Sequence, residues 1–345
     1  MAVTLAEIAR QVGVHVSLVS RVLRDDSSAK LSPAKRAQIL EVAKATGYRP
    51  NRLGRSLRTG RTSIIGVIAP DITNPFYSVM FRGVEAAAAA AGYDTILVNT
   101  DNSLARVKEV VSMLAEGHVD GVLIATAKAV DESVDWLAKE RLPYVLINRR
   151  RIDSDDPWVG PDDFQTGHLG ASHLLGLGHR RIAFLMLDLD IGNIRSRLAG
   201  IQAALKEFKH DPAACFIKTD LSTRSSGKKY VRDLLALPRD QRPTAFFAPQ
   251  TILSDAVAHA IYESGLRIPD DVSMVGYTAQ QVPDFTSIRV PLDEIGRRAT
   301  EHLIGLLSDE RDAAPLPKVP IPVSLIDMGS TAPPPKPNWK AVNPG

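Results

Sequence analysis

From residue 64 onward, short apolar runs alternate with longer helical segments in this chain of 345 residues. The run Ile64–Ala69 is uninterrupted, which is typical of a strand buried on both faces, and the Ala-rich segment 74–91 has helical spacing. Because parallel strands need a crossover helix between them, this alternation predicts an α/β fold with parallel sheets. The expected strands are 64–69, 95–99, 119–125, 144–147, 182–186, 214–218, 245–248 and 273–276, and the expected helices are 74–91, 104–116, 134–139, 162–177, 195–208, 227–237 and 253–263.

The alternation runs twice and restarts at residue 162, which predicts a core of two similar lobes within residues 62–331. Two doubly wound lobes leave a cleft at the carboxyl ends of their strands, where such folds usually bind ligands. The Pro-rich residues 332–345 show no core pattern, and we expect them to form a disordered tail.

Residues 1–49 predict three short helices with a tight turn between the first two, which is a helix-turn-helix module. Thr4 and Glu7 are spaced as a capping box at the start of the first helix, and Gly13 ends it by permitting a positive φ. The expected helices cover about residues 4–12, 16–24 and 32–47, with Leu5, Ile8, Ala9, Val12, Val19, Val22, Leu23, Ile39, Leu40 and Ala43 buried.

The second of these helices has a polar outer side. In a helix-turn-helix module the amino-terminal part of the second helix enters the major groove. Arg can bond guanine there, and Val can contact a thymine methyl group. The pattern therefore indicates a DNA-reading face, although a structural three-helix cap with a solvated face would look the same. The outer side holds Val16, Ser17, Ser20 and Arg21, with His15 at the start of the helix.

Basic charge is concentrated in residues 1–61, which carry 12 of the 42 Lys and Arg residues but only 4 of the 39 Asp and Glu residues. Such a head indicates a polyanionic partner or a solvated basic arm. Residues 50–61 form a marginal helix, because the segment is short and holds Gly54. One interpretation is that it folds when DNA neutralises its arginines, with its leucines as minor-groove wedges. The other, which the pattern alone favours, is a flexible basic linker.

Several ordered segments resemble the LacI-type (lactose-repressor) family of transcription regulators. They include VTLAEIARQVGV followed by VSRVL, then GYRPNRLGRSLRTGRT, IGVIAPDITNPFY and GLRIPDDVSMVGY, and the likeness covers nearly the whole chain. The resemblance implies a DNA-binding head, a hinge helix at residues 50–61 and a periplasmic-binding-protein-like core with an effector between its lobes. It also implies a homodimer on a palindromic operator, and because no carboxyl-terminal heptad pattern is visible, we prefer a dimer to a tetramer.

Two DNA-facing residues depart from the family pattern. His15 stands where a Ser usually caps the second helix, and Gly54 stands where Ala is usual. Because Gly costs about 1 kcal/mol of helix stability against Ala, we expect a hinge that folds less readily and depends more on its DNA site. Carried over residue by residue, the resemblance implies that Val16, Ser17 and Arg21 read bases. It implies that Thr4 and Ser20 contact phosphates and that Leu57 is the minor-groove wedge. The remaining implied DNA-binding residues are His15, Asn51 and Gly54.

The resemblance also implies an effector site, where Phe76 would stack on the ligand. Asn148 and Thr278 stand where carboxylates are usual, while Arg197 is retained. Carboxylates suit hydroxyl donors and repel anions, so their loss predicts an anionic effector, a sugar acid or sugar phosphate, with Arg197 as its bidentate partner. The alternative is a pocket that binds a neutral sugar or nothing. Asp163 stands where the family usually has Asn, and its negative charge argues against an anionic effector. The implied effector-binding residues are Phe76, Asn148, Asp163, Arg197, Gln250 and Thr278.

Other functional classes find little support in the sequence. The single cysteine, Cys215, excludes an intrachain disulfide and a Cys-based zinc site. No Gly-x-Ser-x-Gly elbow, Walker-type loop or i, i+4 pair of histidines is present, so we expect no enzyme, no metal and no cofactor.

The remaining rival is a solute-binding protein for transport, which would share the core but require export and no basic head. Residues 1–13 lack a signal-peptide pattern, and no apolar run approaches the roughly 20 residues of a membrane span. We therefore expect a cytoplasmic DNA-binding regulator, a repressor controlled by a small molecule.

Overall fold

The computed structural model describes residues 3–23, 30–48, 60–126, 132–188, 191–221, 223–280, 283–308 and 318–335. Contacts divide the chain into two units, residues 1–62 and 63–345. None of the helices within the described ranges is long and apolar enough to cross a membrane. The first unit holds α1 (Leu5–Val12), α2 (Val16–Val22) and α3 (Pro33–Ala45).

The three helices of the first unit enclose a small apolar core, as the helical spacing predicted. Thr4 caps α1 by accepting a hydrogen bond from the backbone N–H of Glu7 at 3.3 Å, and Gly13 ends the helix with a φ of 69°. The expectation that Leu40 is buried was wrong: it is 48% exposed, because Ile39 and Ala43 already form the inward stripe of α3. The buried core consists of Ile8, Ala9, Val12, Val19, Val22, Ile39 and Ala43.

A half-buried lysine joins the first and third helices. The Lys35 ammonium group donates to the backbone carbonyl of Val12 at 2.6 Å. The last carbonyls of a helix have no partner within the helix, and a cation near them also interacts favourably with the helix dipole. This contact therefore satisfies the end of α1 while fixing it against α3.

The second unit, the core of the protein, contains two lobes, each built on one six-stranded sheet. The first lobe consists of β1 (Ile64–Ala69), α5 (Pro75–Ala90), β2 (Asp94–Asn99), α6 (Leu104–Ala115), β3 (Gly121–Ile124), α7 (Glu132–Lys139), β4 (Tyr144–Ile147), β5 (Trp158–Pro161), α12 (Leu292–Leu307) and β11 (Val319–Ile321). The second consists of α8 (Asp163–Gly176), β6 (Ile182–Leu185), α9 (Gly192–Glu207), a 3₁₀ turn (Pro212–Ala214), β7 (Phe216–Lys218), α10 (Arg224–Leu235), β8 (Ala245–Phe247), α11 (Thr251–Glu263), β9 (Ser273–Thr278), β10 (Ser287–Arg289) and β12 (Ser324–Ile326).

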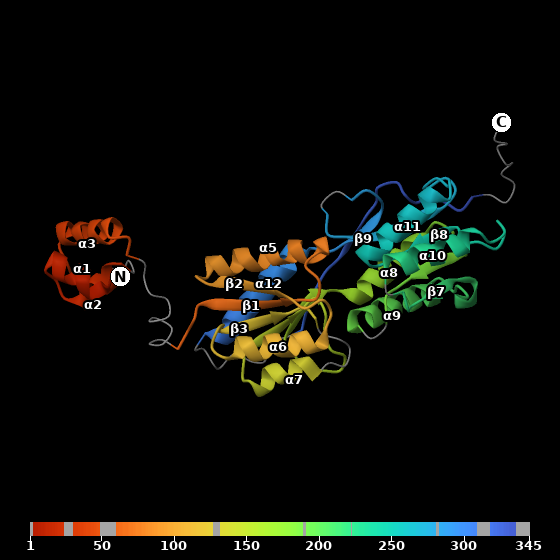
Figure 1. Ribbon diagram of the computed structural model, residues 1–345. Helices are drawn as coiled ribbons and strands as arrows, with labels where there is room; N and C mark the ends of the chain where they lie inside the picture. The colour runs from red at the N-terminus through yellow and green to blue at the C-terminus, as the bar shows by residue number, and fades with distance from the viewer. Residues whose placement is uncertain are drawn as a thin grey trace. The chain divides into compact units, whose positions relative to one another are not determined.

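The sheet of the first lobe has the strand order β11-β5-β4-β3-β1-β2, and its strands pair in parallel. Helices α5 and α12 cover one face, and α6 and α7 cover the other (Figure 1). Ile65 and Val67 pack under the first helix pair, whereas Ile68 packs under the second. Burial on both faces is the reason that β1 is apolar throughout its length.

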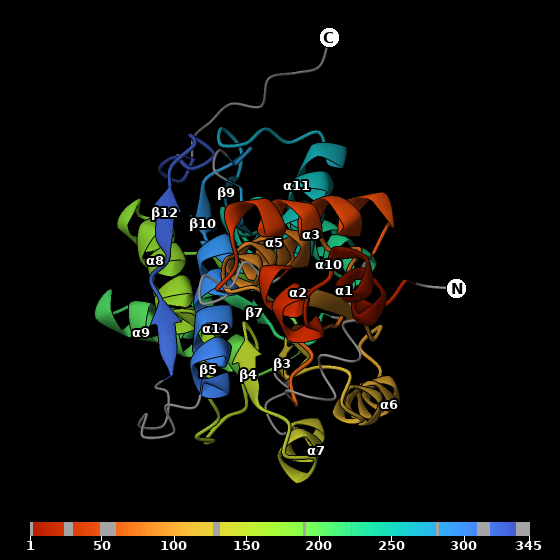
Figure 2. The same cartoon turned by 90° about the vertical axis from the view of Figure 1, so that its left-hand side faces the viewer.

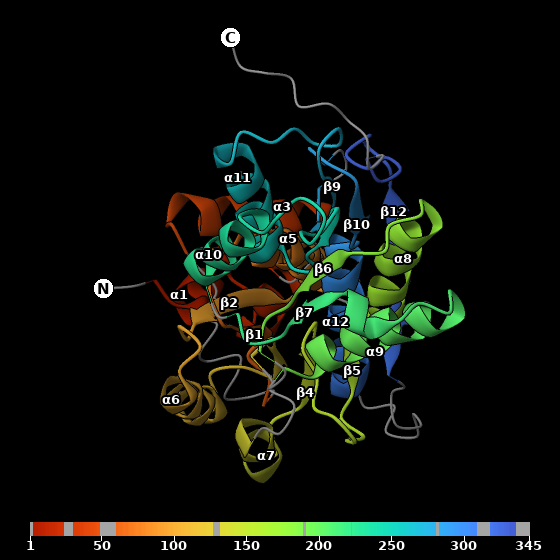
Figure 3. The same ribbon diagram turned by 90° about the vertical axis from the view of Figure 1, so that its right-hand side faces the viewer.

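The sheet of the second lobe has the order β12-β10-β9-β8-β6-β7. Helices α8 and α9 lie on one face and α10 and α11 on the other, as Figure 3 shows. The prediction of parallel sheets was wrong at one edge, because β12 pairs with β10 in the antiparallel sense, side by side in Figure 2.

The sequence predicted that the alternation of strands and helices ends at residue 276. In the structure it continues beyond that residue, and the two lobes are interleaved along the chain. Beyond that point come β10, α12, β11 and β12, and β5 was also missed. Strands of three or four residues give too little periodicity to be seen in the sequence. Because α12 and β11 return to the first lobe, the chain crosses between the lobes three times, after β5, after β10 and after β11.

The last described residues belong to the core, not to the tail expected at residues 332–345. The Ala332 backbone exchanges two hydrogen bonds with the Ser273 hydroxyl, each 3.0 Å long, and its carbonyl lies 2.9 Å from the His179 ring. Residues 336–345, the rest of the expected tail, lie outside the described residues.

Candidate functional site

A polar pocket lies at the junction of the two lobes, with an empty volume of about 480 Å³ including space open to solvent. It is formed at the carboxyl ends of β4 and β9 and at the amino termini of α5, α9 and α11. The cleft predicted from the doubly wound pattern occupies this position. The residues that line it are Asn74, Phe76, Tyr77, Asn148, Arg149, Leu187, Ile191, Asn193, Ile194, Arg197, Gln250, Thr251, Ile252 and Tyr277.

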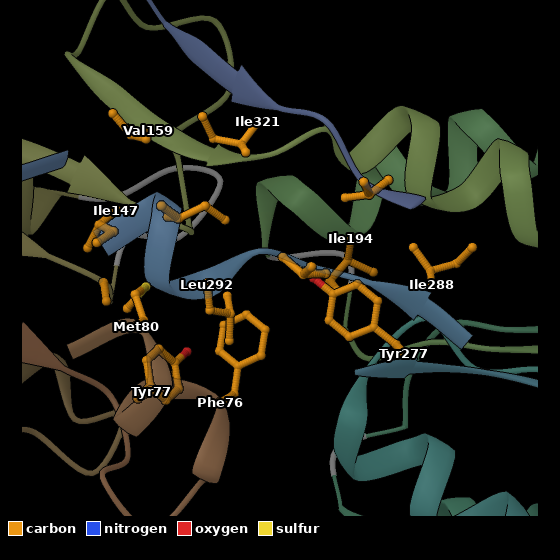
Figure 4. Packing of buried hydrophobic residues seen from close by; sticks show 14 of the residues in the cluster. Phe76, Tyr77, Met80, Ile147, Val159, Ile194, Tyr277, Ile288, Leu292 and Ile321 are labelled. Carbon is orange, nitrogen blue, oxygen red and sulfur yellow. The ribbon is translucent and has the colours of Figure 1, made fainter. Parts of the chain in front are cut away.

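Two aromatic rings flank the pocket from opposite lobes. Phe76 comes from α5 and Tyr277 from β9, and Figure 4 shows them beside Leu292 and Ile194. Their ring centroids are 6.1 Å apart and their planes differ by 18°. The apolar cluster of which they are part continues through both lobes, so the pocket lies on a shared core.

Arg197 lies at the second-lobe wall with every guanidinium nitrogen engaged. Its Nε donates to the Asp163 carboxylate at 2.8 Å, and one terminal nitrogen donates to the Tyr277 hydroxyl at 2.8 Å. The other terminal nitrogen donates to the Pro249 carbonyl. The guanidinium carbon also lies 4.4 Å from the centroid of the Tyr277 ring. The side chain is thus held rigidly, and only 3% of it is exposed.

Burial and charge act against each other in this cluster. Burial raises the pKa of Asp163 to about 6, although the Arg197 charge opposes the rise. The pKa of Arg197 is raised despite burial, because Tyr277 and Asp163 favour its charged form. The pKa of Tyr277 is also raised, mainly by burial, so its hydroxyl stays neutral and accepts from Arg197. The cluster therefore places a charged Arg197 against a carboxylate that neutralises it near pH 7.

Several buried polar atoms of the lining have no hydrogen-bond partner. They are the side-chain oxygens of Asn148 and Asn193 and both amide atoms of Gln250. These three side chains are 4%, 5% and 5% exposed, respectively. Gln250 occupies the N-cap position of α11 without making a side-chain capping bond. Because buried polar groups are normally satisfied, the pocket is suited to a ligand that supplies both donors and acceptors.

Four of the six effector-binding residues implied by the resemblance line this pocket: Phe76, Asn148, Arg197 and Gln250. The other two do not. Asp163 lies behind Arg197 and reaches the pocket only through it. The Thr278 hydroxyl is turned away from the lining and accepts a hydrogen bond from the Gln280 backbone at 3.0 Å.

Sequence reasoning did not assign several polar lining residues, among them Asn193, Arg149 and Tyr277. Tyr277 directly precedes the implied Thr278, so the end of β9 carried the signal although the facing side chain was misjudged there. Arg149 directly follows Asn148, and both line the pocket. Side chains alternate along a strand, and a one-residue error moves the assignment to the wrong face. For Asn193 we find no sequence signal beyond its place at the start of a helix.

The outer face of α2 in the first unit carries the predicted DNA-reading residues. Val16 is 38% exposed, Ser17 and Arg21 are exposed, and Ser20 is half-buried. His15 caps the helix, because its Nδ1 accepts from the backbone N–H of Ser17 at 3.3 Å. Thr4 is exposed at the start of α1, and the hinge residues Asn51, Gly54 and Leu57 lie outside the described residues.

The described parts of the chain contain no cluster of three or more His, Cys, Asp or Glu side chains arranged to hold a metal ion. The Arg197–Asp163 pair adjoins a pocket lined by apolar side chains and amides.

Comparisons with known proteins agree with both units. Residues 4–51 match the family of bacterial regulatory proteins of the lacI type, and residues 171–331 match a periplasmic binding protein-like domain. Catabolite control protein A of Priestia megaterium is 30% identical over 316 residues, covering 90% of this chain and 94% of that protein. The ribose operon repressor of Escherichia coli K12 is 31% identical over 307 residues, covering 87% and 92%.

A solved structure extends the likeness to the core. The LacI family transcriptional regulator from Enterococcus faecium, crystallised with bound ribose, is 28% identical and covers 78% of this chain and 99% of its own, with a TM-score of 0.68. From the ordered motifs, the helix-turn-helix head, the two-lobed core and these relatives, we conclude that the chain belongs to the LacI family of bacterial regulatory proteins.

Proposed function

We propose that this protein is a transcription repressor that binds a palindromic operator as a homodimer and responds to a small molecule in the interlobe pocket. The observation that carries the proposal is that one chain has both an exposed polar face on α2 and a pocket whose buried amide side chains lack hydrogen-bond partners. Its relatives include a ribose operon repressor and a family member with bound ribose. As an operator-binding protein of bacteria, it would act in the cytoplasm.

On the DNA side, α2 is the recognition helix. Val16, Ser17 and Arg21 would contact base edges, while the Ser20 hydroxyl and Thr4 would contact phosphates. His15 would set the amino terminus of the helix, and the hinge, through Asn51, Gly54 and Leu57, would enter the minor groove at the operator centre.

On the effector side, the ligand would lie against the paired rings of Phe76 and Tyr277, with Asn148 and Gln250 bonding its polar groups. Arg197 would present a fixed donor surface, held by Asp163, and Thr278 would support the end of β9. Closure of the lobes on the ligand would alter the geometry of the paired DNA-binding heads. Because the coupling is reciprocal, an effector that weakens operator binding must itself bind less tightly in the presence of operator.

A transport function was the alternative reading of the core. A solute-binding protein needs no basic DNA-binding head, and the relatives reported above are regulators of transcription. We therefore do not propose it.

Selection of binding sites from random double-stranded DNA, followed by affinity measurement at several salt concentrations, tests the proposal. We expect a palindromic site whose affinity falls steeply with salt, because phosphate contacts release counterions. Arg21→Ala should weaken binding to that site by about 1–3 kcal/mol and relax the preference at one base pair. An equal loss on random DNA would make Arg21 a phosphate contact, and the absence of any selected site would refute operator binding.

A further inference from the structure

We infer that the effector carries an anionic group, a carboxylate or a phosphate, and that Arg149 binds this group in place of the expected Arg197. The inference rests on the proposed function, since it concerns the ligand of the same pocket. It replaces the assignment that the sequence favoured with one based on which arginine has a charge that no described carboxylate already matches.

Arg197 is poorly suited to bind an anion. Its Nε and both terminal nitrogens already donate to Asp163, Tyr277 and the Pro249 carbonyl. Its charge is matched at 2.8 Å by a carboxylate whose side chain is only 1% exposed. An incoming anion would have to displace Asp163 into an apolar interior or lie beside it, and both cost free energy.

Arg149, by contrast, lines the pocket, and no carboxylate among the described residues pairs with its charge. It is half-buried, and its recorded side-chain bond is a weak one of 3.4 Å to the Asn102 amide oxygen. Typical N–H···O bonds are about 2.7–3.2 Å long, so a ligand oxygen would displace this one at little cost. No ion pair joins Arg149 to a carboxylate among the residues that the structure describes.

The backbone places Arg149 at the pocket edge. Asn148 adopts a φ of 63°, and the Arg149 N–H donates to the Ile147 carbonyl at 2.8 Å. This tight turn follows directly on β4, so the Arg149 backbone, from which the side chain reaches the pocket, is fixed at the end of the sheet. A planar guanidinium held in this way can bond two oxygens of a carboxylate or a phosphate.

The remaining lining also favours negative charge. The amino termini of α5, α9 and α11 meet at the pocket, and each carries a partial positive charge from its helix dipole. Among the described lining residues, none is Asp or Glu. Where the family usually has a carboxylate, Asn148 supplies a neutral amide that accepts hydroxyl donors without repelling an anion.

The buried amides define the rest of the ligand. The unpartnered oxygens of Asn148, Asn193 and Gln250 need donors, and the Gln250 amide nitrogen needs an acceptor. Hydroxyl groups supply both, and the stacked rings of Phe76 and Tyr277 offer an apolar surface beside them. A small polyhydroxyl compound with one terminal carboxylate or phosphate, a sugar acid or a sugar phosphate, meets these requirements.

The test measures thermal stabilisation and calorimetric affinity of the full chain with matched probes: glucose, gluconate and glucose 6-phosphate; ribose, ribonate and ribose 5-phosphate; and inorganic phosphate. A ligand that binds only the folded state raises the melting temperature. We expect the acids or the phosphates to stabilise the protein at concentrations where their neutral parents do not. Stabilisation by one charged set alone identifies the anionic group.

Two variants assign the arginine. Arg149→Met should weaken binding of the charged probe about 10-fold or more, as expected for loss of a charge-assisted hydrogen bond. Arg150→Met is the matched control, because Arg150 stacks on Trp158 and bonds Ser196 outside the pocket lining. It removes the same charge one residue away and should change affinity less than about twofold.

A third variant tests the missing carboxylate and keeps the inference falsifiable if Arg149→Met folds poorly. Asn148→Asp places a negative charge beside Arg149 and should abolish binding of the charged probe while leaving or improving binding of its neutral parent.

Equal stabilisation by neutral and charged probes, no stabilisation by any probe, or equal losses in Arg149→Met and Arg150→Met would each overturn the inference. Operator binding separates this failure from failure of the proposed function. A neutral sugar that stabilises the protein and releases the selected operator leaves the function intact and refutes only the anionic effector.

Discussion

His15 shows how a single residue can depart from a family pattern and keep its structural role. Its ring nitrogen Nδ1 accepts from the Ser17 backbone, as a Ser oxygen would at the N-cap of α2. The same nitrogen lies 2.8 Å from the Ser17 hydroxyl, which donates to it in the tautomer that carries its proton on Nε2. Ser17 is then left with its oxygen lone pairs for DNA, which accept from base amino groups.

The capping role predicts the effect of changing this residue. His15→Ala should destabilise the head by about 1 kcal/mol, because an orphan N–H at the start of α2 loses its acceptor. His15→Ser should retain the stability, since Ser also caps. Thermal unfolding of the three proteins, followed by circular dichroism, measures the difference, and an Ala variant as stable as the Ser variant would show that the ring does not cap.

At the scale of elements, a glycine in each lobe allows two helices to cross in close contact. A Cβ at Gly83 would lie 2.0 Å from the Asp293 carbonyl oxygen, where α5 crosses α12. A Cβ at Gly167 would lie 1.9 Å from the Arg197 carbonyl oxygen, where α8 crosses α9. The second crossing brings the Arg197 guanidinium within bonding distance of Asp163, so helix packing determines the geometry of the pocket wall.

Gly167→Ala should therefore affect both stability and ligand binding. The added methyl group cannot fit and must push α9 away, at a cost of about 1–3 kcal/mol or more, and Arg197 should move with it. Urea unfolding and affinity for the stabilising probe measure the two effects. Gly176→Ala, at the end of the same helix with nothing within 4 Å of the new Cβ, is the control and should be neutral or stabilising. Equal behaviour of the two variants would contradict the close crossing.

At the scale of the whole core, a buried histidine joins the carboxyl-terminal segment to the second lobe. His179 is fully buried and lies 2.8 Å from the Thr244 hydroxyl and 2.9 Å from the Ala332 carbonyl. It thus ties the last described segment to the second lobe. Burial lowers its pKa to about 4, because an imidazolium would be poorly solvated there.

This shift predicts a loss of stability on acidification. Between pH 6.5 and pH 4 the unfolded chain binds a proton at His179 that the folded protein does not bind, so the free energy of unfolding falls as pH falls. The loss from this residue should reach at most about 3 kcal/mol near pH 4 and is absent above pH 7. Urea unfolding of the parent protein and of His179→Gln at pH 7 and pH 5 isolates it. Identical pH slopes in the two proteins would contradict the assignment.

The sequence by itself determined the class of fold and the position of the site. Period-2 and period-3.6 apolar patterns are local, so β1, α5 and the three helices of the head could be predicted from neighbouring residues. The rule that parallel strands end at one edge of a sheet then located the pocket. The resemblance to the LacI-type family supplied Phe76, Asn148, Arg197 and Gln250, which line it.

Only the tertiary structure decided which lobe the late elements join and which arginine is neutralised. Asp163 and Arg197 are 34 positions apart, and Arg197 and Tyr277 are 80 apart, so no local pattern records their pairing. The return of α12 and β11 to the first lobe likewise depends on long-range packing. A charge is available to a ligand only if the fold has not already matched it, and that depends on which helices cross.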